Sequence, residues 1–177
     1  TMSEPMHIGI AGAGLLGRLL AWRLARAGHR VAVFDPAAGP EGVLRSRAPE
    51  PYLPTAAGFT AAGMLSPLAE LDNAEPAVAA LGWRSLPLWQ RIAAALPGRP
   101  FFAAQGSLMV AHRTDAGAAQ RVVDRLRAAT ATPEWRALSP AEGAQPLDTV
   151  ALRVLEPAVQ GPAQAWLLPG EGQIDTV

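Results

Sequence analysis

The sequence contains no cysteine and no lysine. Without cysteine there is no disulfide framework, no thiolate nucleophile and no cysteine-based metal site. Without lysine no side-chain amine can form a Schiff base with a carbonyl compound. All 15 basic side chains are arginine, which we attribute to codon usage in a GC-rich genome, because alanine, proline and glycine are abundant. These absences exclude several kinds of covalent catalysis.

Excess charge and long apolar runs are also missing. The chain of 177 residues has a formal net charge of +0, which removes the usual electrostatic argument for binding nucleic acid or an anionic membrane. No signal peptide or membrane-spanning run is visible, so we expect a cytoplasmic protein. Half of the residues are hydrophobic, which suffices for a domain with a real core.

Side chains for acid–base or metal chemistry are few. No Gly-x-Ser-x-Gly elbow occurs, so hydrolase chemistry has no support. The acidic cluster of Glu70, Asp72 and Glu75 reads as a solvated helix start. The histidines lie far apart without a metal-ligand partner at helical spacing: His7, His29 and His112. We therefore expect no metal site and no protein nucleophile, and a reaction whose difficult chemistry belongs to a cofactor.

A glycine motif near the N-terminus supplies a cofactor site. An apolar run ends in Gly-x-Gly-x-x-Gly at Gly12, Gly14 and Gly17, and a helix-like segment follows, with Gly28 as its C-terminal cap. The first glycine allows the tight turn, the second lets a pyrophosphate approach the backbone, and the third lets the helix pack closely on the strand. The helix N-terminus offers unpaired N–H groups to the phosphates.

Asp35 closes a second apolar run, where it would accept hydrogen bonds from the adenosine ribose. Strand, glycines, helix, strand and acid follow in the order of one βαβ unit, although a glycine-rich turn in an unrelated α/β protein remains the alternative. An acid here disfavours the 2′-phosphate of NADP. The motif alone does not separate NAD from FAD.

The next segment favours a flavin. Residues 36–54 are rich in proline and cannot form a regular helix, whereas an NAD-binding unit would continue with a helix and a strand. The small, uncharged segment 60–65 could lie flat against a planar ligand, with Gly63 allowing close approach; an ordinary helix start in the core fits it equally well.

The remaining pattern predicts alternating elements. Pro76 begins a long helix in which Pro87 predicts a kink or a division, and its tryptophans read as core. We also expect a helix over 115–129, with Thr114 as its candidate cap, and a short helix opened by the capping box at 139–142. Strands are predicted over 101–103, 106–112, 134–138, 150–155 and 163–168.

Together these segments resemble the D-amino-acid-oxidase-like flavoproteins, and within them the glycine oxidases of thiamine biosynthesis. The specific matches are Ala61-Ala62-Gly63-Met64-Leu65 and Gly170-Glu171-Gly172-Gln173-Ile174-Asp175, beside the more widely shared glycine motif. The resemblance covers almost the whole chain but only about the first half of a family member.

The resemblance implies an α/β fold: a Rossmann-type, glutathione-reductase-like FAD-binding domain with the start of a mixed-sheet substrate domain. Residues 1–75 would form the FAD-binding part, 76–168 the first part of the substrate domain, and 169–177 the return to the FAD domain. The cofactor would be FAD. Its contacts would come from Gly12, Ala13, Gly14, Leu15, Leu16, Gly17, Asp35, Pro36, Ala61, Ala62, Gly63 and Met64.

The implied reaction is oxidation of a small amine or amino acid, such as glycine, sarcosine or a D-amino acid. A hydride would pass to flavin N5, and oxygen would reoxidise the flavin to give hydrogen peroxide. The family's carboxylate-binding arginine and last flavin contacts would lie beyond Val177, so we expect a fragment, or a second polypeptide that completes the protein. A homo-oligomer is also implied.

Three alternatives stay open. One is a D-amino-acid dehydrogenase that passes electrons to a quinone, and another is a non-catalytic flavin-binding subunit or fragment. The third is an NAD-dependent dehydrogenase. The loop 36–59 departs from the family by its length and proline content, and in it Thr55 and Gly58 are candidate contacts only.

Overall fold

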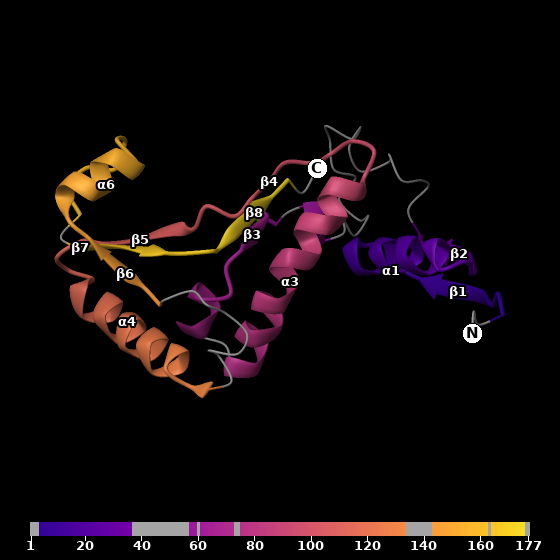
Figure 1. Cartoon of the computed structure of the whole chain (residues 1–177), viewed down its shortest axis with the longest axis horizontal. Helices are drawn as coiled ribbons and strands as arrows, with labels where there is room; N and C mark the ends of the chain where they lie inside the picture. The colour runs from indigo at the N-terminus through magenta and orange to yellow at the C-terminus, as the bar shows by residue number, and fades with distance from the viewer. Residues whose placement is uncertain are drawn as a thin grey trace. The chain divides into compact units, whose positions relative to one another are not determined.

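The computed structural model describes residues 4–36, 57–59, 61–72, 75–133, 143–162 and 164–175 (Figure 1). The chain divides into two compact units. Unit 1 comprises residues 1–63 with 176–177, and unit 2 comprises residues 64–175. The predicted loop 36–54, apart from Pro36, lies outside the described residues, and so do the segments predicted over 134–138 and 139–142.

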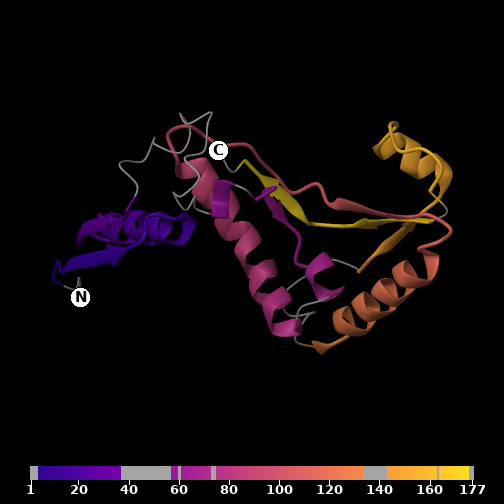
Figure 2. The same cartoon turned by 180° about the vertical axis from the view of Figure 1, so that it is seen from behind.

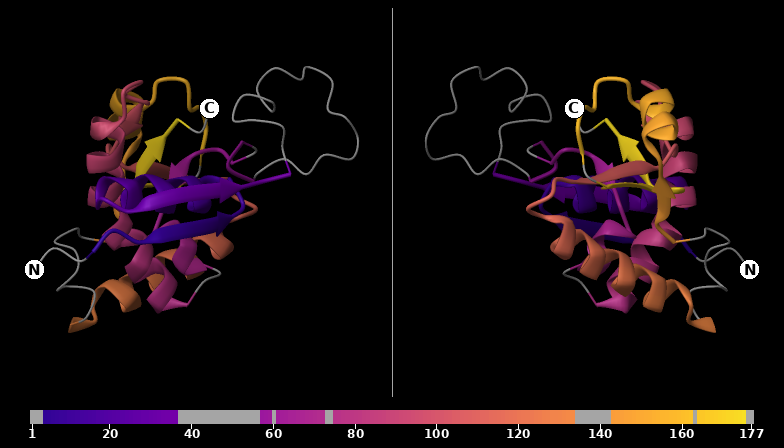
Figure 3. Two further views of the ribbon diagram at one scale, coloured as in Figure 1. Left: turned by 90° about the vertical axis from the view of Figure 1, so that its right-hand side faces the viewer. Right: turned by 90° about the vertical axis from the view of Figure 1, so that its left-hand side faces the viewer.

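Unit 1 is built on a parallel strand pair with one helix. The strands β1 (His7–Ala11) and β2 (Arg30–Phe34) run in the same direction, and the helix α1 (Leu15–Arg26) connects them and packs on the pair (Figure 3). The helix ends as predicted, because Gly28 takes a positive φ of 92° that residues with a side chain rarely adopt. A short 3-10 turn, η1 (Ala57–Phe59), follows later.

Burial within unit 1 is sparse. Ile10 is the one buried apolar side chain among its described residues. The leucine stripe on α1 is left open: Leu16 is 80% exposed and Leu20 is 47% exposed. Helix packing on this strand pair therefore contributes little apolar burial from the described residues.

Unit 2 holds two antiparallel sheets of three strands. The first has the order β3–β8–β4, and the second has the order β5–β7–β6. Their bounds are Met64–Leu65 for β3, Phe102–Ala103 for β4, Ser107–Ala111 for β5, Gln145–Leu147 for β6, Gln164–Leu168 for β7 and Gly172–Ile174 for β8. All strand pairs among the described residues of unit 2 are antiparallel, so the mixed sheet that we expected for the substrate domain is not found among them.

Two segments of the chain run from one sheet directly into the other (Figures 1 and 2). The strand β4 leads into β5 through residues 104–106, and β7 leads into β8 through residues 169–171. At this junction the Gly106 N–H donates to the Glu171 carbonyl oxygen over 2.9 Å. The strands predicted over 101–103 and 106–112 therefore belong to two different sheets.

The helices of unit 2 supply its core. They are η2 (Ala69–Asp72), α3 (Pro76–Ala95), α4 (Ala116–Thr130) and α6 (Thr149–Leu155). Val123 of α4 is fully buried beside Ala111 and Trp166 of the second sheet. Leu126 of α4 is fully buried in a second cluster, which also contains Leu68, Leu71, Ala79 and Leu168, with Trp83 packed against it. Each such side chain contributes about 1.5–3 kcal/mol relative to exposure.

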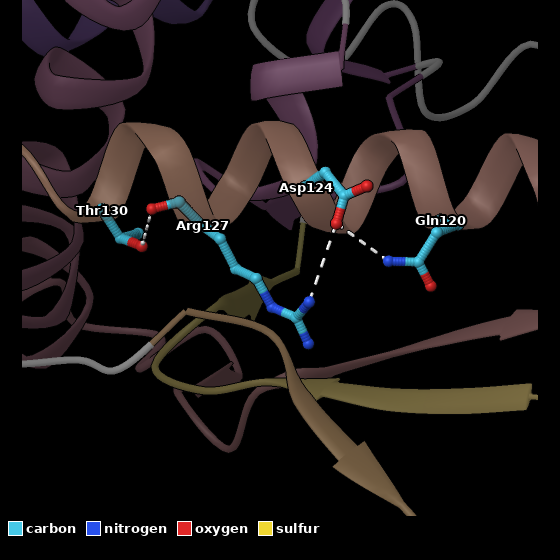
Figure 4. A network of polar contacts seen from close by, with 4 residues as sticks. All are labelled: Gln120, Asp124, Arg127 and Thr130. Atoms are coloured by element: carbon cyan, nitrogen blue, oxygen red, sulfur yellow. Dashed lines mark hydrogen bonds and ion pairs between the residues drawn. The ribbon is translucent and has the colours of Figure 1, made fainter.

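The face of α4 that carries Gln120, Asp124 and Arg127 is polar (Figure 4). Gln120 donates to the Asp124 carboxylate over 2.8 Å, and the Arg127 guanidinium lies 3.6 Å from the same carboxylate. Both charged side chains of this pair are more than half exposed, so it adds little stability. The helix predicted over 115–129 is confirmed, but Asp115, rather than Thr114, is the N-cap, and its side chain makes no capping hydrogen bond.

Three expectations about elements are wrong or incomplete. The segment 150–155, predicted as a strand, is the helix α6, because Asp148 caps its N-terminus: the carboxylate accepts the Ala151 N–H over 2.7 Å. The helix α3 is not divided at Pro87, which lies inside one continuous helical span and is exposed. The strand β6 was not predicted at all.

Candidate cofactor site

The glycine turn at the end of β1 has the geometry that the motif requires at two positions. Gly12 has a φ of 99°, and its N–H donates to the Phe34 carbonyl oxygen over 2.7 Å, so the turn is tied to the end of β2. At Gly17 an added Cβ would come within 1.9 Å of the Gly12 carbonyl oxygen. Only glycine at position 17 lets α1 start this close to the turn.

The N-terminus of α1 is left open to an anion. Gly14 is the N-cap, none of the described side chains caps the helix there, and its first turn contains no acidic residue. The first N–H groups of a helix have no partner within the helix and carry a partial positive charge. This end of α1 can therefore receive a phosphate group.

Asp35 meets the glycine turn. Its carboxylate accepts the Ala13 N–H over 2.6 Å, although the two residues are 22 positions apart. The Arg18 side chain, one helical turn into α1, donates to the Ala13 carbonyl oxygen over 2.5 Å. Pro36 follows at the surface. The acid that closes β2 thus lies at the edge of the glycine turn, where a ribose beside a bound pyrophosphate would need it.

A concavity of about 680 Å³ opens over this turn and the start of α1. It includes six of the residues predicted to contact the cofactor: Gly12, Gly14, Leu15, Leu16, Gly17 and Ala61. It also includes Ala57 and Gly58 of η1; Gly58 was a candidate contact, whereas Ala57 was not foreseen. The volume lies in the range of small-molecule and cofactor sites.

The described part of the segment expected to line the flavin is not helical: it bends at Ala61 and ends in the strand β3. Ala61 and Ala62 are exposed, and Gly63 is buried with a φ of 73°. Met64, which is 59% exposed, begins the strand β3 in unit 2. The alternative of a helix start is therefore wrong for these residues.

Glu171 is a functional candidate that our sequence analysis quoted within a motif but gave no role. It is fully buried, and burial raises the pKa of its carboxyl group, while hydrogen bonds from Ser107 and from two backbone amides oppose that shift. The signal for it was a glutamate between two glycines directly after an apolar strand. No sequence pattern shows which distant amides such a side chain will reach.

The remaining polar candidates among the described residues do not come together in a metal site. Among the described residues, no group of three or more histidine, cysteine or acidic side chains is arranged to hold a metal ion. His112 is exposed after β5, and its carbonyl oxygen accepts the Asp115 N–H over 3.0 Å. No helix in the described part of the chain is long and apolar enough to cross a bilayer.

The open helix N-terminus, the tight glycine turn and the acid after β2 fit an adenine dinucleotide. The family model described as FAD dependent oxidoreductase (DAO) matches residues 7–177. The chain belongs to this family, and its cofactor is FAD. The predicted resemblance is thereby confirmed, and the NAD-dependent alternative is set aside.

Two relatives give the comparison more detail. A protein of Rhizobium etli, provisionally named thiamine biosynthesis oxidoreductase ThiO, is 35% identical over 156 residues, which cover 88% of this chain and 38% of that protein. The crystal structure of iminodiacetate oxidase (IdaA) from Chelativorans sp. BNC1 matches with a TM-score of 0.68 at 22% identity, over 95% of this chain and 40% of that one. The chain thus spans well under half the length of either relative.

Proposed function

We propose that this chain contributes the FAD site and part of the substrate domain of an enzyme that oxidises a small amine or amino acid. The substrate class is glycine, sarcosine, a D-amino acid or a related secondary amine. The observation that carries the proposal is the concavity at the start of α1, where Gly17 and Asp35 meet the requirements of a dinucleotide. The name of one similar protein, iminodiacetate oxidase, states an amine as its substrate, which favours the amine class here.

In this proposal the residues of unit 1, together with Met64, bind and orient the cofactor. The N–H groups at the start of α1 would hold the pyrophosphate, and Asp35 would hold the adenosine ribose, with Pro36 beside it. Leu15 and Leu16 would cover the phosphates through their backbone. Ala61, Ala62, Gly63 and Met64 would line the flavin ring and exclude water from it.

When bound, FAD supplies the acceptor for the hydride that leaves the substrate's α-carbon. No described side chain then has to act as nucleophile or metal ligand. The imine product would hydrolyse to a carbonyl compound and an amine or ammonia. We further propose that the residues which grip the substrate carboxylate lie in a part of the polypeptide outside this chain, and that the whole assembles as a homo-oligomer in the cytoplasm.

The test is an absorbance spectrum of the complete polypeptide that carries this chain, recorded before and after anaerobic addition of substrate. We expect flavin bands in the purified protein and their bleaching by at least one of glycine, sarcosine, D-alanine and iminodiacetate. A spectrum without flavin, or flavin that none of these amines reduces, would overturn the proposal.

The electron acceptor is then decided by a second measurement. Peroxide formation under air in step with substrate loss supports an oxidase. Reduction of an artificial quinone without peroxide would instead identify a dehydrogenase. Bound flavin that reacts with no amine, in the presence of every polypeptide that co-purifies, would indicate a non-catalytic flavin-binding subunit.

A further inference from the structure

Glu171 lies in the turn between β7 and β8, in the junction of the two sheets of unit 2. It is the one buried charged residue among the described residues, with 0% of its surface exposed. Taking a carboxylate out of water is costly unless hydrogen bonds satisfy its oxygens. The contacts of this side chain therefore explain why it is tolerated there.

Those contacts join three segments that are far apart in the sequence. One carboxylate oxygen accepts the Leu68 N–H over 2.8 Å and the Ala69 N–H over 2.9 Å. The other accepts the hydroxyl of Ser107, the first residue of β5. The backbone carbonyl of Glu171 also accepts the Gly106 N–H. A single residue thus ties the chain after β3 to the start of β5.

The strand β3 itself is short, and the chain after it is held both by Glu171 and by the buried side chains of Leu68 and Leu71. The strand β3 consists of two residues, and its pairing with β8 is limited to Met64 opposite Gln173 and Leu65 opposite Gly172. Hydrogen bonds from backbone N–H groups to a charged oxygen are roughly twice as strong as neutral ones. The two bonds at Leu68 and Ala69 therefore hold this short strand more firmly than its pairing alone.

A polar cluster surrounds the carboxylate. The hydroxyl oxygen of Ser66 is buried, makes no hydrogen bond of ordinary geometry with a described residue, and lowers the pKa of Glu171. Leu68, whose N–H the carboxylate accepts, is fully buried in the apolar core. The carboxylate and its polar partners therefore adjoin the apolar core, and two of those partners, Ser66 and Leu68, belong to the segment that begins with Met64.

We propose that Glu171 is a positioning residue for the flavin wall: by holding the amides of Leu68 and Ala69 it fixes where Met64 and Leu65 lie. This inference rests on the proposed function only in so far as Met64 lines the flavin. Glu171 acts through the backbone that it holds and takes no proton or hydride from the substrate.

The test compares Glu171→Ala with Glu171→Gln in the complete polypeptide, with Asp124→Asn on the exposed face of α4 as the matched control. Amide hydrogen exchange is measured first on protein without flavin. We expect the Leu68 and Ala69 amides of Glu171→Ala to exchange about 10-fold faster or more than in the wild type. Glu171→Gln should recover part of the protection, because its amide oxygen can accept the same two N–H groups. The control should leave both amides unchanged.

The second readout is the visible spectrum of added FAD. We expect Glu171→Ala to shift the flavin bands and Glu171→Gln to restore them in part, since a displaced Met64 changes the surroundings of the ring. Ser107→Ala, which removes a contact and keeps the charge, is the further variant if Glu171→Ala does not fold. It should speed exchange at Leu68 and Ala69 by a smaller factor.

The two readouts separate this inference from the proposed function. Unchanged exchange at Leu68 and Ala69 in Glu171→Ala, or in Ser107→Ala where only that variant folds, would overturn the positioning role. Faster exchange with an unshifted flavin spectrum would overturn it as well, because the hydrogen bonds of Glu171 would then not affect the position of Met64 beside the flavin. Absence of flavin binding in the wild type would overturn the proposed function and with it the flavin part of this inference, while the exchange result would still measure the hydrogen bonds of Glu171.

Discussion

The absence of a side chain at Gly17 allows the start of α1 to lie close to the glycine turn. A Cβ at this position would meet the Gly12 carbonyl oxygen at 1.9 Å, and a backbone atom cannot move aside as a flexible side chain can. The start of α1 would have to move away from the glycine turn. The N–H groups offered to the phosphates would move with it.

We therefore predict that Gly17→Ala weakens FAD binding by at least about 10-fold, equivalent to about 1.4 kcal/mol. Flavin fluorescence titration of the complete polypeptide measures this. The matched control is Gly98→Ala in the turn after α3, where an added Cβ meets nothing within 4 Å. Equal affinities for the two variants would contradict the close-approach argument.

Glu171 should make the free energy of unfolding depend on pH, and the direction of its pKa shift sets the sign. Burial raises its folded-state pKa above the ordinary value of 4.5, so between these two values the folded protein binds more protons at this site than the unfolded protein. The stability associated with the neutral carboxyl is present below about pH 4.5 and is lost as the pH rises through the folded pKa.

We predict that the free energy of unfolding of Glu171→Gln, relative to the wild type, rises with pH across that window, by at most about 1.4 kcal/mol per pH unit. Above the folded pKa the difference should level off. Denaturant melts at pH values from 4 upwards measure it, with Asp124→Asn correcting for loss of a surface charge. A difference that falls with pH would show that hydrogen bonds, rather than burial, dominate the pKa.

Among the elements, α4 and α6 form a natural pair, because both have an aspartate as N-cap. The Asp148 carboxylate accepts the Ala151 N–H in α6, whereas Asp115 makes no such bond in α4. The helix α6 has seven residues and would be marginal without its cap.

We predict that Asp148→Ala lowers the free energy of unfolding by about 1 kcal/mol. Asp115→Ala should cost only a few tenths of a kcal/mol, because it loses the interaction with the helix dipole but no capping bond. Urea melts of both variants measure the two effects. A larger loss for Asp115→Ala would contradict the capping geometry.

These elements also show what the sequence could and could not predict. The strand–glycine–helix–strand order and the helix α4 followed from the spacing of glycines and apolar residues, although the cap predicted at Thr114 was wrong. The helix α6 was misread because its valines favour a strand, although Asp148 offered a start signal three residues before Ala151. The strand β6 contains Pro146, which argued against a strand; the strand lies at the end of its sheet, where proline is tolerated.

At the scale of the whole molecule, burial is unequal between the two units. Nearly all buried apolar side chains of the described residues belong to unit 2, and unit 1 contributes Ile10. Without its ligand, unit 1 should therefore open more easily than the core around Val123 and Leu126.

We predict that FAD protects the amides of β1 and α1 from hydrogen exchange much more than those of α4. At a concentration 100 times the dissociation constant, the stabilisation should reach about 2.7 kcal/mol for the state that binds. Exchange of the complete polypeptide, with flavin removed and then restored, measures this. Equal gains in both units, or none, would contradict a site on unit 1.

The candidate site was predictable where it depends on local sequence. The glycine turn, its helix and Asp35 lie within one βαβ unit, so their spacing carried the prediction. Glu171 could not be placed, because its partners Leu68 and Ser107 come from distant segments. The hydrogen bonds of Glu171 with these partners form only when the fold brings the distant segments together.

The separation of Leu68 from Glu171 by 103 positions has a consequence for synthesis of the protein on the ribosome. The segment 64–69 leaves the exit tunnel early, yet its hydrogen-bonding partners in β8 and at Glu171 emerge about a hundred residues later. Contacts so far apart in sequence pay a large loop-closure entropy and form late. The segment 64–69, which we propose to lie beside the flavin, should thus be among the last parts of this chain to become ordered, because it has to wait for β8 and Glu171.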